Sequence, residues 1–164
     1  MPDAASADLP GRAETLPRAV AWLAYGGLLP FVALAAASLV AQFNGIESSL
    51  WEAALITYGA AILSFVGALH WGFAMTLRGL TASQRTSSYV WSVVPALMAW
   101  VALLVVPLVA TVVLVCGFIA HYWRDRALAA QADLPSWYLP MRLRLTGVAC
   151  LSLAAPTVVN FLKA

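Results

Sequence analysis

Charged residues are scarce in this chain of 164 residues. Asp, Glu, Lys and Arg make up 10% of it, whereas a soluble domain carries roughly 25%. Hydrophobic residues make up 63%, and the mean hydropathy is +0.86. This composition excludes an ordinary soluble domain, and the few arginines lie in short polar loops rather than in a patch for nucleic acid. We therefore expect lipid to surround most of the chain.

Cysteine is also scarce, with only Cys116 and Cys150 in the chain, both inside apolar runs. This excludes a disulfide framework. Both are expected at a depth in the membrane similar to that of His70, so the three side chains are candidate ligands for a soft metal such as Cu(I) or Zn. The alternative is that both cysteines are small core residues.

Sequence signatures of enzymes are missing as well. The chain contains no GxSxG, no HExxH, no phosphate-binding loop and no pair of carboxylates within an apolar run. Spacing therefore predicts no catalytic residue, and no motif specifies a cofactor.

Residues 1–16 differ in composition from the rest. They combine Asp3, Asp8 and Glu14 with Arg12, a mixture typical of neither a secretory signal nor a mitochondrial transit peptide. We expect a short disordered cytosolic tail here, followed by one membrane domain over residues 17–164.

Long apolar runs fill that domain, and at ~1.5 Å per residue each can cross a hydrocarbon layer of ~30 Å. They predict an all-α integral membrane bundle of five transmembrane helices. Pro30 should kink the first span, and the long apolar run after Tyr89 is divided at Pro107, because proline ends or begins a helix. The predicted spans are about 17–43, 51–77, 88–106, 107–123 and 142–162.

Basic residues predict the orientation of this bundle. With five spans, every Lys and Arg except Lys163 falls on one side, and the other side carries Glu47 and Glu52. Because Lys and Arg accumulate on the cytosolic side of membrane proteins, we expect a cytosolic N-terminus and a C-terminus outside.

His70 is the ionisable residue in the middle of the second span, among many small residues. At ~100° per residue, it shares one helix face with Gly59, Leu63, Val66, Gly67 and Ala74. Small residues allow close helix packing in lipid, so His70 should face the bundle interior.

Several roles are open to His70, because an ionisable residue inside a membrane is by default a functional hypothesis. It could ligate a haem or chlorin, bind a metal, bind a small apolar molecule or relay protons. Alternatively it is a neutral structural residue hydrogen-bonded to Ser92 or Thr146, the nearest polar side chains by depth. His121 is expected at the membrane surface, too far from His70 in depth for a two-histidine clamp.

The loop before the fifth span is a candidate docking surface for a partner. Its candidate residues are Asp133, Trp137, Tyr138, Arg142 and Arg144. Asp125 or Asp133 should pair with an arginine at the exposed rim, where ion pairs contribute little. Towards the other side, Glu52 and Asn160 are expected to form caps or interhelix hydrogen bonds.

Three stretches resemble one family: Tyr58 to Gly72 ending in GALHWG, WSVVPAL from Trp91, and LPSWYLPMRLRL from Leu134, with YGGLLPF from Tyr25 fainter. The chain is similar to a family of small multi-pass membrane proteins of unknown function that includes the transmembrane protein 69-like proteins. The resemblance implies the bacterial inner membrane, and mitochondria for eukaryotic relatives. It supplies no activity and no site residues.

Three hypotheses for the function follow. The first is a non-enzymatic accessory or assembly component of a larger membrane complex or homo-oligomer, suggested by small and aromatic residues and seven tryptophans. The second is an intramembrane ligand binder that uses His70. The third is a small-solute transporter with kinked spans, although no internal repeat supports it.

Overall fold

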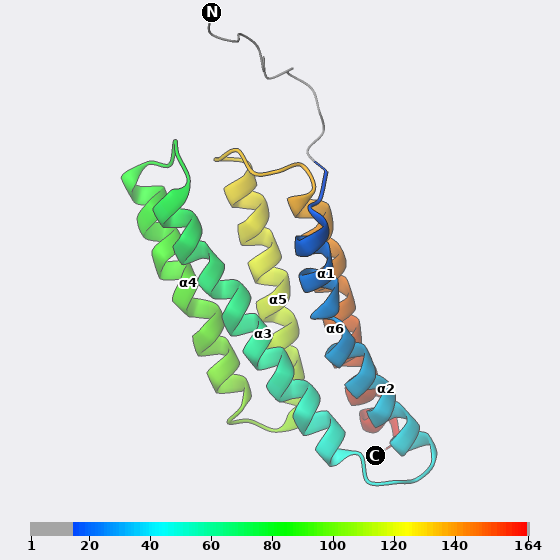
Figure 1. The fold of residues 1–164 in the computed structure, drawn as a ribbon. Helices are drawn as coiled ribbons and strands as arrows, with labels where there is room; N and C mark the ends of the chain where they lie inside the picture. Colours follow the sequence, from blue (N-terminus) through cyan, green and yellow to red (C-terminus); the bar gives the residue numbers. More distant parts are fainter. Residues whose placement is uncertain (1–14, 164) are drawn as a thin grey trace, which may run out of the picture.

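Helices make up nearly all of the computed structural model, which describes residues 15–163 (Figure 1). The helices are α1 (Arg18–Gly26), α2 (Leu29–Phe43), α3 (Ser49–Thr76), α4 (Ala82–Ala102), α5 (Pro107–Ala129) and α6 (Tyr138–Lys163). Because α1 and α2 continue one another, the described residues form a bundle of five rods, and the predicted all-α class is confirmed. The predicted tail, residues 1–16, lies outside the described residues except for its last two.

Four of the rods are long and apolar enough to cross a membrane: Arg18–Phe43, Ser49–Thr76, Pro107–Ala129 and Tyr138–Lys163. Helix α4 is not among them, although it has 21 residues. Its first two turns, from Ala82 to Tyr89, are polar and include Gln84, Arg85 and Thr86. The chain is thus a multi-pass protein, and α4 is the described rod that is not apolar enough to be a candidate span.

The break between α1 and α2 is where a kink was predicted. Residues Gly27 and Leu28 form a turn, and Pro30 lies in the first turn of α2. A backbone carbonyl freed within a membrane needs another partner. The Tyr58 hydroxyl of α3 supplies one, donating to the Gly27 carbonyl at 2.8 Å.

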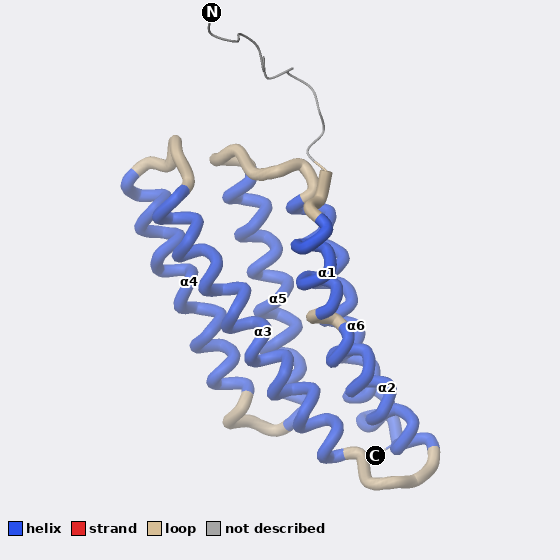
Figure 2. The backbone as a smooth tube through the Cα atoms, in the orientation of Figure 1, coloured by secondary structure: helices blue, strands red, loops and turns tan. Residues whose placement is uncertain are grey.

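The two ends of the bundle differ in charge. Figure 2 shows the α3–α4 and α5–α6 loops at the end where α1 begins, and the α2–α3 and α4–α5 loops at the other. We call the first the basic end, because within residues 15–163 it carries seven arginines: Arg18, Arg78, Arg85, Arg124, Arg126, Arg142 and Arg144. This separation is the one on which the predicted orientation depends.

Helix α3 is the central rod of the bundle, and its predicted inner face is confirmed. Gly59, Leu63, Val66, Gly67, His70 and Ala74 are all buried. A Cβ atom added at Gly67 would lie 2.7 Å from the Cβ of Pro95 in α4. The glycine therefore allows α4 to approach α3 at the proline.

The middle of the bundle is apolar. Phe31, Leu63, Leu114 and Leu153 come from four different helices and are almost fully buried. Beyond this core, at the end opposite the basic end, Glu52 accepts hydrogen bonds from Gln42 at 2.7 Å, Ser48 at 3.1 Å and Asn160 at 3.4 Å. The predicted hydrogen-bonding roles of Glu52 and Asn160 are thereby confirmed.

Three helices extend past the predicted spans at the basic end. Helix α4 begins at Ala82 rather than 88, because Thr81 and Gln84 form a capping box that fixes its start. Helix α5 continues to Ala129 rather than 123, and α6 begins at Tyr138 rather than 142. The predicted limits marked the ends of the apolar runs, whereas the helices continue through polar residues.

Candidate functional site

Asp125 is the centre of a buried polar cluster near the basic end. Its side chain is fully buried, and its two oxygens face donors from α3 and α6. His70 Nε2 lies 3.1 Å from Oδ1, the Tyr138 hydroxyl donates to Oδ1 at 3.0 Å, and Arg142 Nε donates to Oδ2 at 2.7 Å. Because Tyr138 and Arg142 both donate to it, Asp125 is an ionised acceptor, and the guanidinium of Arg142 balances its charge. A carboxylate can only accept, so His70 donates to it through Nε2.

His70 faces the bundle interior, as predicted, but its predicted partners are wrong. Ser92 donates to the Tyr89 carbonyl of its own helix, and Thr146 is not the residue bound to the ring. The ring instead meets Asp125 through Nε2, and Nδ1 is buried with no hydrogen-bond partner among the described residues. His70 therefore contacts Asp125 through Nε2, and its Nδ1 is unpaired among the described residues.

His121 is fully buried between helices, and its predicted separation from His70 is wrong. Its ring centroid lies 5.0 Å from that of His70, and its Nε2 lies 3.7 Å from Asp125 Oδ1. The prediction compared distances along each helix from the nearest arginines, whereas α5 continues past Arg124 to Ala129 and packs His121 beside His70. The two histidines are close neighbours, not residues at different depths.

Trp91 of α4 determines which nitrogen of His121 carries hydrogen. The indole Nε1–H donates to His121 Nδ1 at 3.1 Å, and an indole nitrogen can only donate. Nδ1 must therefore be the acceptor, so the hydrogen of the neutral ring is on Nε2, directed at Asp125. At 3.7 Å from Oδ1, this N–H faces the carboxylate but is too far away to form a hydrogen bond.

This tautomer bears on metal binding. His70, His121 and Asp125 offer ligand atoms that lie within 4.8 Å of one another, a spacing that a metal ion could bridge. A histidine ligates metal through a nitrogen that has no hydrogen, while its other N–H donates. Trp91 imposes the opposite arrangement on His121, so the cluster fits a hydrogen-bond network better than a metal centre.

Two of the five predicted docking residues are not on the surface. Tyr138 and Arg142 are buried in the Asp125 cluster, so their assignment to a docking surface is corrected. Asp133 and Arg144 are exposed, and Trp137 is half-buried. The predicted pairing of Asp125 with an arginine is confirmed at Arg142, but the pair is buried and not at an exposed rim.

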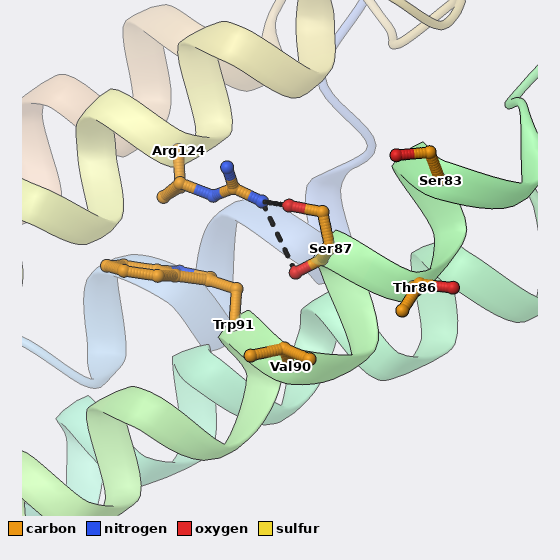
Figure 3. Close-up of a pocket in the computed structure, with 6 residues that line it drawn as sticks. All are labelled: Ser83, Thr86, Ser87, Val90, Trp91 and Arg124. Carbon is orange, nitrogen blue, oxygen red and sulfur yellow. Dashed lines mark hydrogen bonds between the residues drawn. The ribbon is translucent and has the colours of Figure 1, made fainter.

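Arg124 covers the outer side of Trp91. Its guanidinium carbon lies 5.3 Å from the centre of the indole ring, and Nη2 donates to the Ser87 hydroxyl at 2.9 Å (Figure 3). Together with Ser83, Thr86 and Val90, these residues line a surface hollow of about 490 Å³. Arg124 thereby packs on the ring whose N–H donates to His121.

Two cavities reach the cluster from different sides. The first, of about 200 Å³, is polar and includes His70, Ser88, Arg124 and Gln131 in its lining. The second is an apolar groove of about 480 Å³ between α1, α3 and α6, whose lining includes Tyr138, Arg142 and Thr146. We call them the polar cavity and the apolar groove.

Sequence reasoning missed the centre of the site. It singled out His70 but treated Asp125 and His121 as surface residues. The missed signal was spacing, since His121 and Asp125 in α5, and Tyr138 and Arg142 in α6, are pairs four residues apart that share a helix face. Cys116 is exposed and Cys150 half-buried, and the structure groups His70 with Asp125 rather than with either cysteine.

Comparison with known proteins places these features in a family. A family model described as "Protein of unknown function (DUF3429)" matches residues 16–158. The chain is 34% identical over 146 residues to Transmembrane protein 69 of Xenopus tropicalis, which covers 87% of the chain and 54% of that protein. The chain thus spans about half the length of this relative. No solved structure matches.

Proposed function

The chain belongs to the DUF3429 family of multi-pass membrane proteins of unknown function, and we propose that it binds a small ligand at the Asp125 cluster. The observation that carries this proposal is a set of three buried atoms: His70 Nδ1, His121 Nε2 and Arg142 Nη2. None has a hydrogen-bond partner among residues 15–163. Buried polar groups are normally paired, and a bound ligand would supply partners for these three.

Energetics also support a functional cluster. A buried ion pair such as Asp125–Arg142 adds little stability, because removing two charges from water costs about as much as their attraction returns. Well-packed apolar residues would stabilise this part of the bundle at least as well. Ionisable residues that persist inside membranes mark binding sites and ion pathways.

Access to the cluster supports ligand binding over a sealed structural role. His70 lines the polar cavity and Arg142 lines the apolar groove, so two of the three unpaired atoms belong to residues that line cavities. At about 200 Å³, the polar cavity is smaller than the ~300–1,000 Å³ of pockets for drug-sized molecules. This size favours a small molecule over a haem or chlorin as the partner of His70.

The other two hypotheses have less support. An accessory role would depend on Asp133, Trp137 and Arg144, the three candidate docking residues outside the buried cluster. A transport path would have to connect the Asp125 cluster with Glu52 at the opposite end, and the apolar core of Leu63, Leu114 and Leu153 lies between them. For the surroundings, we propose the bacterial inner membrane, with the basic end in the cytosol.

The test is to extract the protein from membranes in polymer-bounded nanodiscs and count small molecules per chain by mass spectrometry. We expect one species at about one per chain in the wild type. His70→Gln and Arg142→Lys should lower its occupancy about tenfold, the effect of losing one hydrogen bond to a charged or buried group. Arg144→Lys, in the same helix but exposed, is the matched control.

The outcomes separate the hypotheses. Thermal unfolding must show that all four proteins are folded. A wild type without a stoichiometric small molecule, or equal occupancy in all four proteins, would refute the proposal. Stoichiometric protein subunits in place of a small molecule would support the accessory role, and a Soret or chlorin absorption band would restore the tetrapyrrole hypothesis.

A further inference from the structure

The apolar groove between α1, α3 and α6 has a polar strip at one end. Tyr138, Arg142 and Thr146 are spaced by four residues on one face of α6, and all three line the groove. The rest of its lining is apolar and includes Leu23 of α1 and Phe65 of α3, which are exposed on the bundle surface. The groove therefore joins an apolar, outward-facing side to the edge of the Asp125 cluster.

From this arrangement, and resting on the proposed function, we propose that the groove binds a lipid-soluble carbonyl compound with one long apolar tail. The tail lies along the apolar lining, and the carbonyl oxygen accepts a hydrogen bond from Arg142 Nη2. That atom is buried and has no partner among the described residues, although the same guanidinium donates through Nε to Asp125.

The hydrogen-bonding capacity of the strip indicates an accepting head group. Arg142 can only donate, and its Nη2 is the strip's unpaired donor. The Tyr138 hydroxyl already gives its hydrogen to Asp125. A ligand that offered only donors would leave Arg142 Nη2 unpaired, and a buried unpaired donor costs binding free energy. A ligand with an accepting oxygen avoids this cost.

Charge indicates that this oxygen is neutral. The cluster contains one anion, Asp125, and one guanidinium, Arg142, and His121 is neutral because Trp91 occupies its Nδ1. The charges of Asp125 and Arg142 therefore balance one another. A carboxylate or phosphate on Arg142 would add an uncompensated negative charge in a medium where charges are poorly solvated, whereas a keto or quinone oxygen adds none.

The groove is built to admit such a molecule from the side. Helix α1 forms one wall, yet none of its residues is buried. That wall ends at the break before α2, where Gly27 and Leu28 also line the groove. A wall that buries no side chain separates from its neighbours at lower cost than one packed on both faces.

Photoaffinity labelling in nanodiscs tests the inference. Three probes share a C16 chain with a diazirine and differ only in the head group: a methyl ketone, a carboxylate or none. We expect the ketone probe to label α1 and α6 peptides about tenfold more than the headless alkane, as one hydrogen bond to a charged donor implies. The carboxylate probe should label less than the ketone.

Variants locate the site. Ala24→Phe puts a large ring into the groove and should abolish ketone labelling, whereas Ala36→Phe, exposed in α2 and outside the groove, should preserve it. Arg142→Lys should reduce ketone labelling to the level of the alkane. Labelling that is stronger for the carboxylate, equal for all three probes, or displaced by excess bilayer phospholipid would overturn the inference.

The labelling experiment and the mass-spectrometry experiment can give independent results. If a co-purifying molecule depends on His70 and Arg142 while the ketone does not label the groove, ligand binding at the cluster stands and the assignment of the groove is wrong. If the ketone labels the groove but no native molecule depends on the cluster, the groove site stands alone.

Discussion

Trp91 and His121 form a hydrogen-bonded pair with nearly parallel rings across the α4–α5 interface. Their rings are inclined by only 12°, with centroids 6.4 Å apart, and the indole nitrogen lies 3.1 Å from His121 Nδ1. A residue in α4 that does not contact Asp125 thus determines what His121 presents to that carboxylate. The first prediction follows from this pair.

Trp91→Phe should release His121 from its single tautomer. The substitution keeps an aromatic ring but removes the donor, leaving a buried acceptor unpaired at a cost of roughly 1–3 kcal/mol. Nitrogen NMR of labelled histidine should show one tautomer, with hydrogen on Nε2, in the wild type and a mixture in the variant. Trp100→Phe, exposed on the same helix, should leave the His121 signals unchanged; a mixture already present in the wild type would contradict the assignment.

Asp125→Asn should be strongly destabilising although it is nearly isosteric. It leaves the buried guanidinium of Arg142 without a counter-charge, which typically costs ~3–5 kcal/mol. Thermal unfolding in mild detergent measures the loss. Asp133→Asn, an exposed change, should have an effect within ~0.5 kcal/mol, and adding Arg142→Gln to Asp125→Asn should recover part of the stability. Similar unfolding temperatures for both single variants would contradict the buried ion pair.

Gly67→Ala and Gly72→Ala should have opposite effects in the same helix. At Gly67 the new methyl group would lie 2.7 Å from Pro95 Cβ, and at Gly72 nothing lies within 4 Å. Overpacking costs ~1–3 kcal/mol, whereas Ala in place of an exposed helical Gly gains roughly 0.5–1 kcal/mol. Thermal unfolding of the two variants checks this, and equal unfolding temperatures would show that α4 does not approach α3 at Gly67.

Two reporters fused to the C-terminus test the orientation. One that functions only outside the cytosol should be active, and one that functions only in the cytosol should be inactive. The basis is the gathering of arginines at one end of the bundle, with Lys163 at the other. Fusions in the α5–α6 loop should give the reverse pattern and are the internal control. A cytosolic C-terminus would overturn the proposed orientation.

Most of the fold was predictable because it depends on residues that are close together in the sequence. Runs of apolar residues determine the rods, Pro30 and the adjacent glycines determine the break, and the small residues of α3 determine which face is buried. The inner direction of His70 followed from the same periodicity. Helix ends were less predictable, because capping by Thr81 and polar turns beyond the apolar runs extended three helices.

The centre of the candidate site was not predictable in the same way. Asp125 and Arg142 read as rim charges because each lies close to other charged residues, such as Arg124, Arg126 and Arg144. Their burial depends on how α5 and α6 rotate against α3, which no single helix encodes. The spacing of four residues between His121 and Asp125 was available but identifies a face only when the neighbouring helices are known.

The ion pair between Asp125 and Arg142 joins consecutive helices, and this has a consequence for how the chain is made. The ribosome completes α5 before α6, so Asp125 is ready to enter the membrane before the arginine that neutralises it exists. A carboxylate alone in hydrocarbon is costly. Helix α5 therefore cannot settle to its final depth by itself. We therefore expect the two helices and the short segment between them to enter the membrane and dock as one hairpin, so that the site closes only once α6 has been made.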